Sequence, residues 1–348
     1  MAGFSLLKMN LSRTQQQILS TLMYLILLSL FFTIFSRYFL NVDNLFTVAQ
    51  QTTVIAIIAM GQTYVLITGG IDLSIGSNIA LCGMVAGMVI EHDQFVGIQP
   101  NLPVFIGVLL GLLTGVVAGA ANGAMIAYGK LPPFIATLGT MTIARGLALA
   151  MTQGYPITSL AEGFTNLGTG YNFGIGNVYD PDLGINVVQP GLPRIPNIVV
   201  FMVITVFIFG FILQKTKWGR HVYAIGSNFE AARLSGVNTK RTIMMAYIFS
   251  GVLAALAGIL LAARVYSASP AAGDGYELDA VASSVIGGTS PMGGEGSGIG
   301  TFIGAFVIGI LRNGLNLIGV NPFAQKIVIG FVIVGSVFLD RIRNQEKV

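Results

Sequence analysis

Three ionisable residues lie within or beside long apolar stretches, where a charge is costly. Asp72 follows the glycine pair at 69–70 and has apolar segments on both sides. Its carboxylate could cap the helix that begins near Ser74, or it could bind a substrate hydroxyl or a proton. Arg145 and Arg312 lie inside apolar runs, so each needs a carboxylate, a helix C-terminus or water beside it. For both arginines, a structural pair and a role in a transport pathway are open.

Motifs for catalysis and nucleotide binding are missing from the sequence. The stretch 123–131 comes nearest to a phosphate-binding loop, but its spacing before Lys130 is wrong and it lacks the Ser or Thr that would hold Mg²⁺. The two histidines, His92 and His221, have no cysteine or carboxylate cluster near them in the sequence. We expect no catalytic residue, no metal site and no cofactor bound by this chain. If the protein moves solute uphill, the scarcity of intramembrane carboxylates favours energy from another subunit over an ion gradient.

The composition is that of an integral membrane protein. The chain is 54% hydrophobic and 9% charged, whereas soluble domains carry roughly 25% charged residues. Two apolar segments are weak candidates for membrane spans, because 74–91 begins at a glycine-rich break and 277–290 is short and contains polar residues. Eight others approach or exceed the roughly 20 residues that a span requires, namely 18–36, 46–68, 103–128, 133–151, 195–214, 242–264, 298–318 and 324–340.

The distribution of basic residues decides whether the two weak segments span. If all ten segments cross and the N-terminus is inside, most Lys and Arg residues face the cytoplasm, as the positive-inside rule requires. Omitting either weak segment alone would put a basic loop or the basic tail outside. We therefore predict an all-α integral membrane protein with about ten transmembrane helices and cytoplasmic N- and C-termini. Membrane topology thus explains the excess of basic over acidic residues, and we expect no nucleic-acid partner.

Glycines predict both tight packing and interrupted helices. Every fourth residue from Gly107 to Gly123 is glycine, which leaves one helical face as bare backbone for close packing. Other glycines form breaks at 69–70 and 287–288. Non-helical backbone at membrane depth survives only where protein or a water-filled cavity covers it. Paired interrupted segments in the two halves of a chain therefore point to a transport pathway.

Residues 215–241 form a long polar and basic stretch between two apolar segments. Within it, Ser227 and Asn228 are a helix start signal, FEAARLS is the helical run, and Gly236 is a stop signal. The pattern predicts a small helix outside the bilayer, and we expect it to contact another protein. The large segment 152–194, by contrast, falls on the outer side and is too long for a simple turn.

The run Glu230-Ala231-Ala232, followed after three residues by Gly236, is similar to the EAA loop of ABC-importer permeases, which docks into the ATPase subunit. Further stretches resemble the sugar permeases of the ribose, galactose, xylose and autoinducer-2 group, and the ribose type most closely in the loop and the C-terminal half. The region 160–194 departs from that type. The matching stretches cover the chain nearly end to end: GGIDLSIGS (69–77), PPFIATLGTMTIARG (132–146), GRHVYAIGSNFEAARLSGVN (219–238), GYELDAVASSVIGGTSPMGGEGSGIGTFIGA (275–305) and NGLNLIGVNPF (313–323).

The resemblance implies one transmembrane permease domain over 1–348, of the branched-chain amino acid/monosaccharide type, in the bacterial cytoplasmic (inner) membrane. The segment 215–241 would be its cytoplasmic coupling loop and 152–194 its large outer loop. The implied partners are a separate ABC ATPase that carries ATP and Mg²⁺, an extracytoplasmic sugar-binding protein, a second permease copy or paralogue, and membrane lipid. In this interpretation ATP closes the ATPases, the small helix moves with them as a lever, and the bundle switches which side is open.

The resemblance also assigns roles to residues. In the coupling helix, Glu230 and Arg233 would make polar contacts, and Gly236 would end the helix. Ala231 and Ala232 would allow close approach of the ATPase, so the ATPase-coupling set is Asn228, Glu230, Ala231, Ala232, Arg233 and Gly236. A passage for a neutral sugar needs only Asn, Ser, Thr and backbone groups. The candidate pathway residues are Asp72, Ser74, Ser77, Asn78, Asn313 and Asn316.

Two other functions remain open at this stage. An ion-coupled secondary transporter would need coupling carboxylates or Na⁺ sites inside the membrane, for which only Asp72 is a fair candidate. An amino-acid permease of the same wider superfamily would need paired opposite charges for a zwitterion. No group of residues supports a membrane-embedded enzyme or scaffold.

Overall fold

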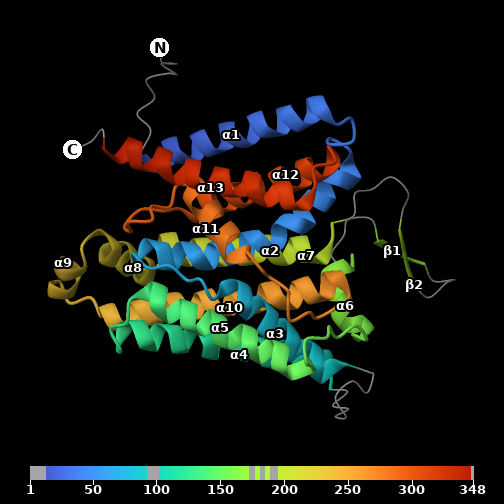
Figure 1. Ribbon diagram of the computed structural model, residues 1–348, viewed down its shortest axis with the longest axis horizontal. Helices are drawn as coiled ribbons and strands as arrows, with labels where there is room; N and C mark the ends of the chain where they lie inside the picture. The colour runs from blue at the N-terminus through green and yellow to red at the C-terminus, as the bar shows by residue number, and fades with distance from the viewer. Residues whose placement is uncertain (1–12, 92–101, 172–176, 181–184, 189–194, 346–348) are drawn as a thin grey trace.

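The computed structural model is a bundle of helices lying side by side (Figure 1). It describes residues 13–91, 102–171, 177–180, 185–188 and 195–345. The elements are α1 (Arg13–Phe35), α2 (Val42–Ile67), α3 (Ile75–Ile90), α4 (Val104–Ala127), α5 (Pro133–Thr152), α6 (Glu162–Thr169), β1 (Asn177–Asp180), β2 (Ile185–Val188), α7 (Asn197–Lys215), α8 (Lys217–Ser227), α9 (Phe229–Leu234), α10 (Thr239–Val265), α11 (Tyr276–Ile286), α12 (Gly298–Leu317) and α13 (Pro322–Gln345).

Seven helices in the described residues are long and apolar enough to cross a membrane: α1, α2, α4, α5, α7, α10 and α12. The helix α3 and the residues Pro322–Val332 of α13 are apolar but shorter, and α11 has 11 residues. Each of the ten segments predicted from the sequence overlaps one of these helices. The weak segment 277–290 is helical only as far as Ile286, because the glycines that follow it end α11.

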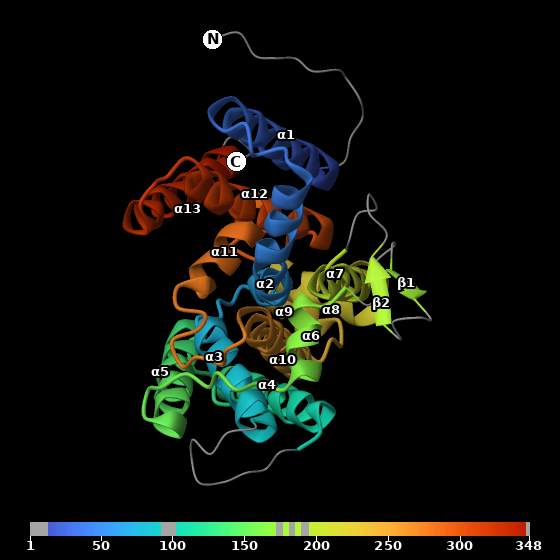
Figure 2. The ribbon, with the colours of Figure 1, turned by 90° about the vertical axis from the view of Figure 1, so that its right-hand side faces the viewer.

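The helices α2 and α10 form the centre of the bundle, where both are largely buried and packed against each other. On one side of them lie α3 and α4, and on the other lie α7, α11 and α12. Figure 2 shows α5 and α13 on the same side of the molecule, with α3 and α11 between them. The central helices therefore form the core, and the outer ones carry most of the exposed apolar side chains.

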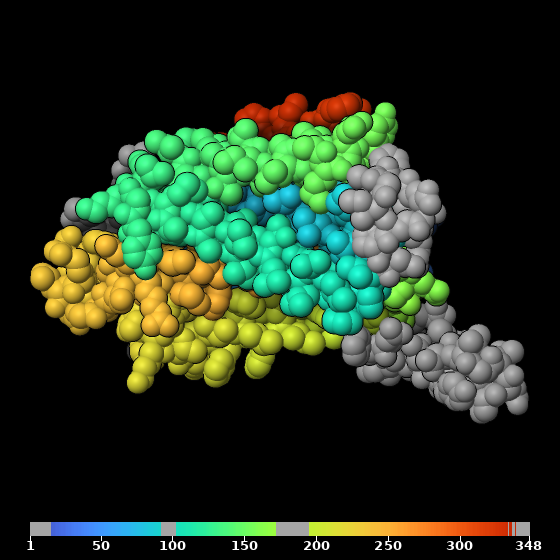
Figure 3. All heavy atoms as spheres, turned by 90° about the horizontal axis from the view of Figure 1, so that it is seen from below, coloured from blue at the N-terminus to red at the C-terminus, as the bar shows by residue number. Residues whose placement is uncertain are grey.

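The glycine face of α4 packs directly on neighbouring backbone, as predicted. A Cβ atom on Gly115 would lie 2.3 Å from the carbonyl oxygen of Gly251 in α10, and one on Gly119 would lie 2.4 Å from that of Tyr247. Large apolar side chains, including Phe105 and Val117, occupy the opposite, exposed face. Figure 3 shows this face of α4 as a band along the surface. One side of α4 thus contacts protein backbone, and the other suits lipid.

Alanine at Gly115 is expected to destabilise the protein, although alanine usually stabilises a helix by about 0.5–1 kcal/mol. The added methyl group would overlap the Gly251 carbonyl oxygen, so we expect a loss of about 1–3 kcal/mol. Gly139 in α5 is the matched control, since a Cβ atom there meets nothing within 4 Å. Thermal unfolding in detergent should show opposite signs for Gly115→Ala and Gly139→Ala. Equal shifts in the unfolding temperature of the two variants would contradict close packing of α4 on α10.

The two ends of the bundle differ. The α9 end carries α8, α9 and the connections 68–74, 128–132 and 287–297, whereas the α6 end carries α6 and the connections 153–161 and 266–275. Within the predicted loop 152–194, α6 and a short antiparallel hairpin of β1 and β2 are present, paired from Asn177↔Val188 to Asp180↔Ile185. The all-α prediction holds for the bundle, and this hairpin was not predicted.

Candidate functional sites: the α9 helix and the polar break at Asp72

The small helix in the polar loop is α9, and its ends match the predicted signals. The Asn228 side chain accepts a hydrogen bond of 2.9 Å from the Ala231 N–H group and so caps the N-terminus. The helix ends at Leu234, and Gly236 follows with φ of +84°, a conformation that favours glycine. The predicted start and stop are therefore confirmed.

One face of α9 is open to solvent. Arg233 donates from Nε (3.0 Å) and Nη2 (2.7 Å) to the Glu230 carboxylate, and both side chains are more than half exposed. Next to this pair, the Leu234 side chain is 81% exposed. Ala232, however, is buried against its own chain, whereas Ala231 is exposed. Of the two alanines expected to admit a partner, only Ala231 therefore faces outward, because the other face of α9 packs toward α8 and α10.

Aromatic packing holds α8, the helix before α9, against the core. The Trp218 ring centroid lies 5.2 Å from that of Tyr64 in α2 and 4.9 Å from that of Phe249 in α10. The Thr216 side chain caps α8 by accepting from the Gly219 N–H group at 3.1 Å. These aromatic contacts join the start of α8 to both central helices, α2 and α10.

Asp72 lies between α2 and α3, with 1% of its surface exposed. One carboxylate oxygen accepts from the Ser74 N–H group at 2.9 Å and from the Ser74 hydroxyl at 2.6 Å. The other oxygen accepts from the Ser250 hydroxyl of α10 at 2.7 Å. Asp72 thus satisfies backbone and side-chain donors where the chain turns into α3, as a residue at a helix start does.

Further side chains extend this arrangement into what we call the Asp72 cluster, formed by Asp72, Ser74, Asn78, Asn122, Thr140 and Ser250. The Ser74 hydroxyl oxygen accepts from the amides of Asn78 (3.0 Å) and Asn122 (2.9 Å). Thr140 of α5 in turn donates to Asn122 at 2.6 Å. The cluster therefore joins α3, α4, α5 and α10 around the break.

The six candidate pathway residues fall into two separate groups. Ser77 lies beside the Asp72 cluster in the first turn of α3 and is buried. Asn313 of α12 instead exchanges hydrogen bonds of 3.0 and 3.1 Å with Asn44 of α2, and Asn316 accepts from Gln325 of α13 at 2.7 Å. Both groups bond to side chains of their own chain, which favours the structural role for Asp72 that the sequence left open.

Sequence reasoning missed Asn122, Thr140 and Ser250. A weak signal existed, because each is a polar residue inside an apolar segment. Their hydrogen bonds to the cluster could not be predicted because the partners are far apart in the sequence. Ser250, for example, is 178 residues from Asp72. Only the packing of α10 and α4 brings these hydroxyl and amide groups to the break.

The two arginines that the sequence singled out, Arg145 and Arg312, have structural partners. Arg145 of α5 donates from Nη1 to the carbonyl oxygens of Pro270 and Ala272, in the connection before α11. Arg312 of α12 pairs with Asp279 of α11, whose side chain is 1% exposed. The partners are therefore backbone carbonyls for one arginine and a carboxylate for the other.

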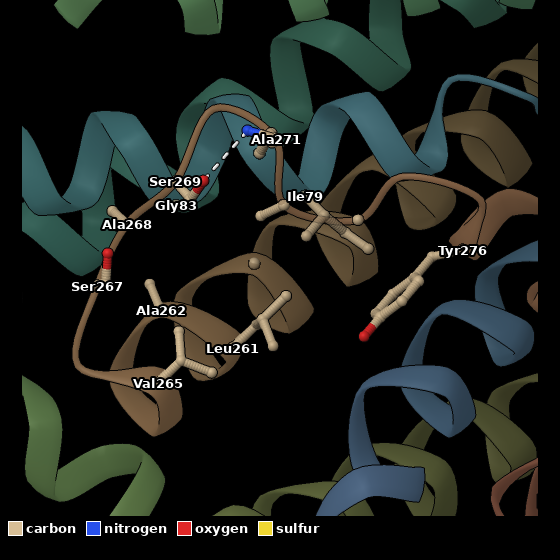
Figure 4. Close-up of a pocket in the computed structure, with 14 residues that line it drawn as sticks. Ile79, Gly83, Leu261, Ala262, Val265, Ser267, Ala268, Ser269, Ala271 and Tyr276 are labelled. Atoms are coloured by element: carbon tan, nitrogen blue, oxygen red, sulfur yellow. Dashed lines mark hydrogen bonds between the residues drawn. The ribbon is translucent and has the colours of Figure 1, made fainter. Parts of the chain in front are cut away.

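A pocket of about 260 Å³ lies between α3, α10 and the connection 266–275 (Figure 4). Aliphatic side chains, among them Ile79, Leu261 and Val265, form much of its wall. The Ser269 hydroxyl oxygen on its rim already accepts from the Ala271 N–H group at 3.3 Å. The pocket offers few partners to a solute rich in hydroxyl groups.

Comparison with known families decides what kind of protein carries these features. Residues 44–337 match the family described as "Branched-chain amino acid transport system / permease component". The chain belongs to this permease family. Permease components are transport subunits and not enzymes, so the expectation of a multi-pass transport protein of the cytoplasmic membrane, without catalytic activity of its own, is confirmed.

Individual permeases are similar over nearly the whole chain. The ribose import permease of Bacillus subtilis is 44% identical over 91% of this chain and 90% of its own length, and that of Escherichia coli K12 is 41% identical over 92% of each. The D-allose permease of Escherichia coli K12 is 35% identical over 91% of this chain and 89% of its own length. The resemblance stated from the sequence is thus confirmed. No solved structure matches the chain.

Proposed function

We propose that this chain is the membrane-spanning subunit of an ATP-driven ABC importer that moves ribose or a similar monosaccharide into the cytoplasm. The proposal rests on the similarity to two ribose import permeases. The chain is 41–44% identical to these, compared with 35% to the D-allose permease. The fold agrees with this role, because it supplies a helical bundle with an exposed helix at one end. ATP and Mg²⁺ would belong to the partner ATPase.

The proposed topology has ten transmembrane segments, α1–α5, α7 and α10–α13, in one permease domain over 1–348. Counting ten returns the chain to its starting side, so both termini lie in the cytoplasm with the α9 end. This places the loop 215–241 inside and the segment 152–194 outside. The packing of α11 supports its inclusion, since Gly287 lies against Gly300 and Ser283 against Gly304 of the antiparallel α12.

The proposed ATPase contact is the exposed face of α9. Glu230 and Arg233 offer an ordered charged pair, Ala231 allows close approach, and Asn228 and Gly236 fix the ends of the helix. Ala232 contributes by packing α9 on its own chain. Because Trp218 anchors the preceding helix to α2 and α10, movement of the ATPase would reach the bundle core.

The proposed passage runs along the side of the molecule where α5 and α13 lie (Figure 2), closed by a second copy of the chain or a paralogue. Lys326 of α13 lies 3.7 Å from the Asp274 carboxylate, and the two side chains are 77% and 78% exposed. Exposed charges beside membrane helices favour contact with water or protein over lipid. The Asp72 cluster with Ser77, and Asn313 with Asn316, would hold the helices behind this wall. A sugar-binding protein would dock on the α6 end.

Uptake by proteoliposomes containing the chain, its ATPase and its binding protein tests the function. Radiolabelled D-ribose should enter only with ATP and should still enter when ionophores abolish ion gradients. Uptake driven by a gradient without ATP would instead establish the secondary transporter. Leucine is the control for the amino-acid alternative, and uptake of leucine in place of ribose would overturn the sugar assignment.

A further inference from the structure

Besides leading into α9, the helix α8 contacts a second segment at the same end of the bundle, the connection 287–297. The Tyr223 hydroxyl donates a hydrogen bond of 2.8 Å to the carbonyl oxygen of Gly296, in the connection 287–297 between α11 and α12. Burial raises the pKa of Tyr223 to about 12, so its hydroxyl keeps its proton at physiological pH. The hydroxyl can therefore donate this hydrogen bond at neutral pH.

One turn further along α8, three segments meet without room for a side chain. A Cβ atom on Gly226 would lie 1.7 Å from the carbonyl oxygen of Ile67 and 2.4 Å from the amide nitrogen of Gly294. The Gly294 N–H group itself donates to the Ile67 carbonyl at 2.9 Å. The last residues of α8 and α2 and the middle of the 287–297 connection thus form one junction, which lies immediately before α9.

The connection 287–297 is itself a folded unit. The Ser290 N–H group donates to the Glu295 carbonyl at 3.0 Å, and the Gly293 N–H group donates to the Ser290 carbonyl at 3.1 Å. Ser297 then caps α12 by accepting from the Gly300 N–H group at 3.3 Å. A displacement applied to this connection would therefore pass to the start of α12 instead of being absorbed within it.

We propose that the connection 287–297 is a second part of the coupling device and that Tyr223 is the positioning residue that holds it to α8. This inference rests on the proposed contact between α9 and the ATPase. When the ATPase displaces α9, α8 moves the end of α2 and the start of α12 together. The two glycine-interrupted segments, at 69–74 and 287–297, then move together in one step.

The variant Tyr223→Phe removes the hydroxyl and keeps the ring. In the reconstituted importer we expect normal co-purification of the ATPase and normal basal ATP hydrolysis, with about a two- to tenfold fall in ribose imported per ATP hydrolysed, the range for loss of one net hydrogen bond. Tyr128→Phe is the matched control, because Tyr128 is an exposed tyrosine at the same end whose ring lies beneath Lys240 Nζ. Import per ATP equal to wild type in Tyr223→Phe would overturn the inference.

A second measurement follows the connection directly. The one native cysteine, Cys82, is buried, and Met292 at the tip of the connection is 86% exposed, so Met292→Cys supplies a single accessible thiol. Its maleimide labelling rate should change when ATP and Mg²⁺ are added to the complex, and this change should vanish with Tyr223→Phe. The inference would be refuted if ATP did not change the labelling rate. It would also be refuted if ATP changed the rate equally in Met292→Cys and in Met292→Cys/Tyr223→Phe. Failure of ATP-driven import in the wild type would refute the proposed function instead.

Discussion

Asp72→Ala is expected to lower the free energy of unfolding by about 3–5 kcal/mol, because three buried donors would lose their acceptor together. Those donors are the N–H and hydroxyl groups of Ser74 and the hydroxyl of Ser250, all within 2.9 Å of the carboxylate. The break between α2 and α3 would lose the contact that ties it to α10. We expect little folded protein from this variant and correspondingly little import.

Asp72→Asn separates the structural role from substrate binding. The asparagine oxygen can still accept from Ser74, and the Ser250 hydroxyl can rotate to accept from the new amide, so most of the stability should remain. Unfolding in detergent, followed by the fluorescence of the single tryptophan Trp218, measures stability, and ribose uptake measures function. If Asp72→Asn is as stable as wild type and abolishes uptake, Asp72 contacts the solute or a proton, and the structural account of the cluster is wrong.

Arg312→Met is expected to destabilise the protein by about 3–5 kcal/mol, because it leaves the buried carboxylate of Asp279 without its cation. The substitution also removes the guanidinium group that lies 5.7 Å from the centroid of the Tyr276 ring. The helices α11 and α12 would then be held mainly by their glycine contacts.

The matched control for Arg312→Met is the double variant Asp279→Leu/Arg312→Met, which replaces the whole pair by apolar side chains. Such replacements are often neutral or stabilising, so thermal unfolding of the double variant should return close to that of wild type. A double variant as unstable as the single one would show that the pair itself, and not the unpaired carboxylate, determines the loss.

The sequence predicted those features that are determined by residues close together in the chain. Asn228 and Gly236 placed the ends of α9 because capping depends on neighbouring residues. The glycines of α4 predicted a packed face because a helix repeats every 3.6 residues. Apolar runs indicated eight of the predicted segments and the charge distribution along the loops added the two weak ones, and a helix of the structure overlaps each.

Features that depend on contacts between distant residues could not be predicted from the sequence. Nothing near Arg312 identifies Asp279 as its partner, since the two residues approach only when α11 folds back against α12. The inward face of Ala232 and the link from Tyr223 to Gly296 likewise depend on how α8 and α9 sit on the bundle. The helical fold class and the ends of α9 were therefore predictable, whereas the partners of buried polar groups were not.

Co-purification with the candidate ATPase in detergent tests the central claim, that α9 couples this permease to an ATPase. Wild type and Glu162→Ala, an exposed carboxylate on α6 at the opposite end, should both retain the ATPase. Glu230→Ala/Gly236→Pro should remain folded and lose it, because proline cannot adopt the φ of +84° at Gly236 and Arg233 loses its partner. An ATPase that binds the double variant as tightly as wild type, or that binds neither form, would contradict the account.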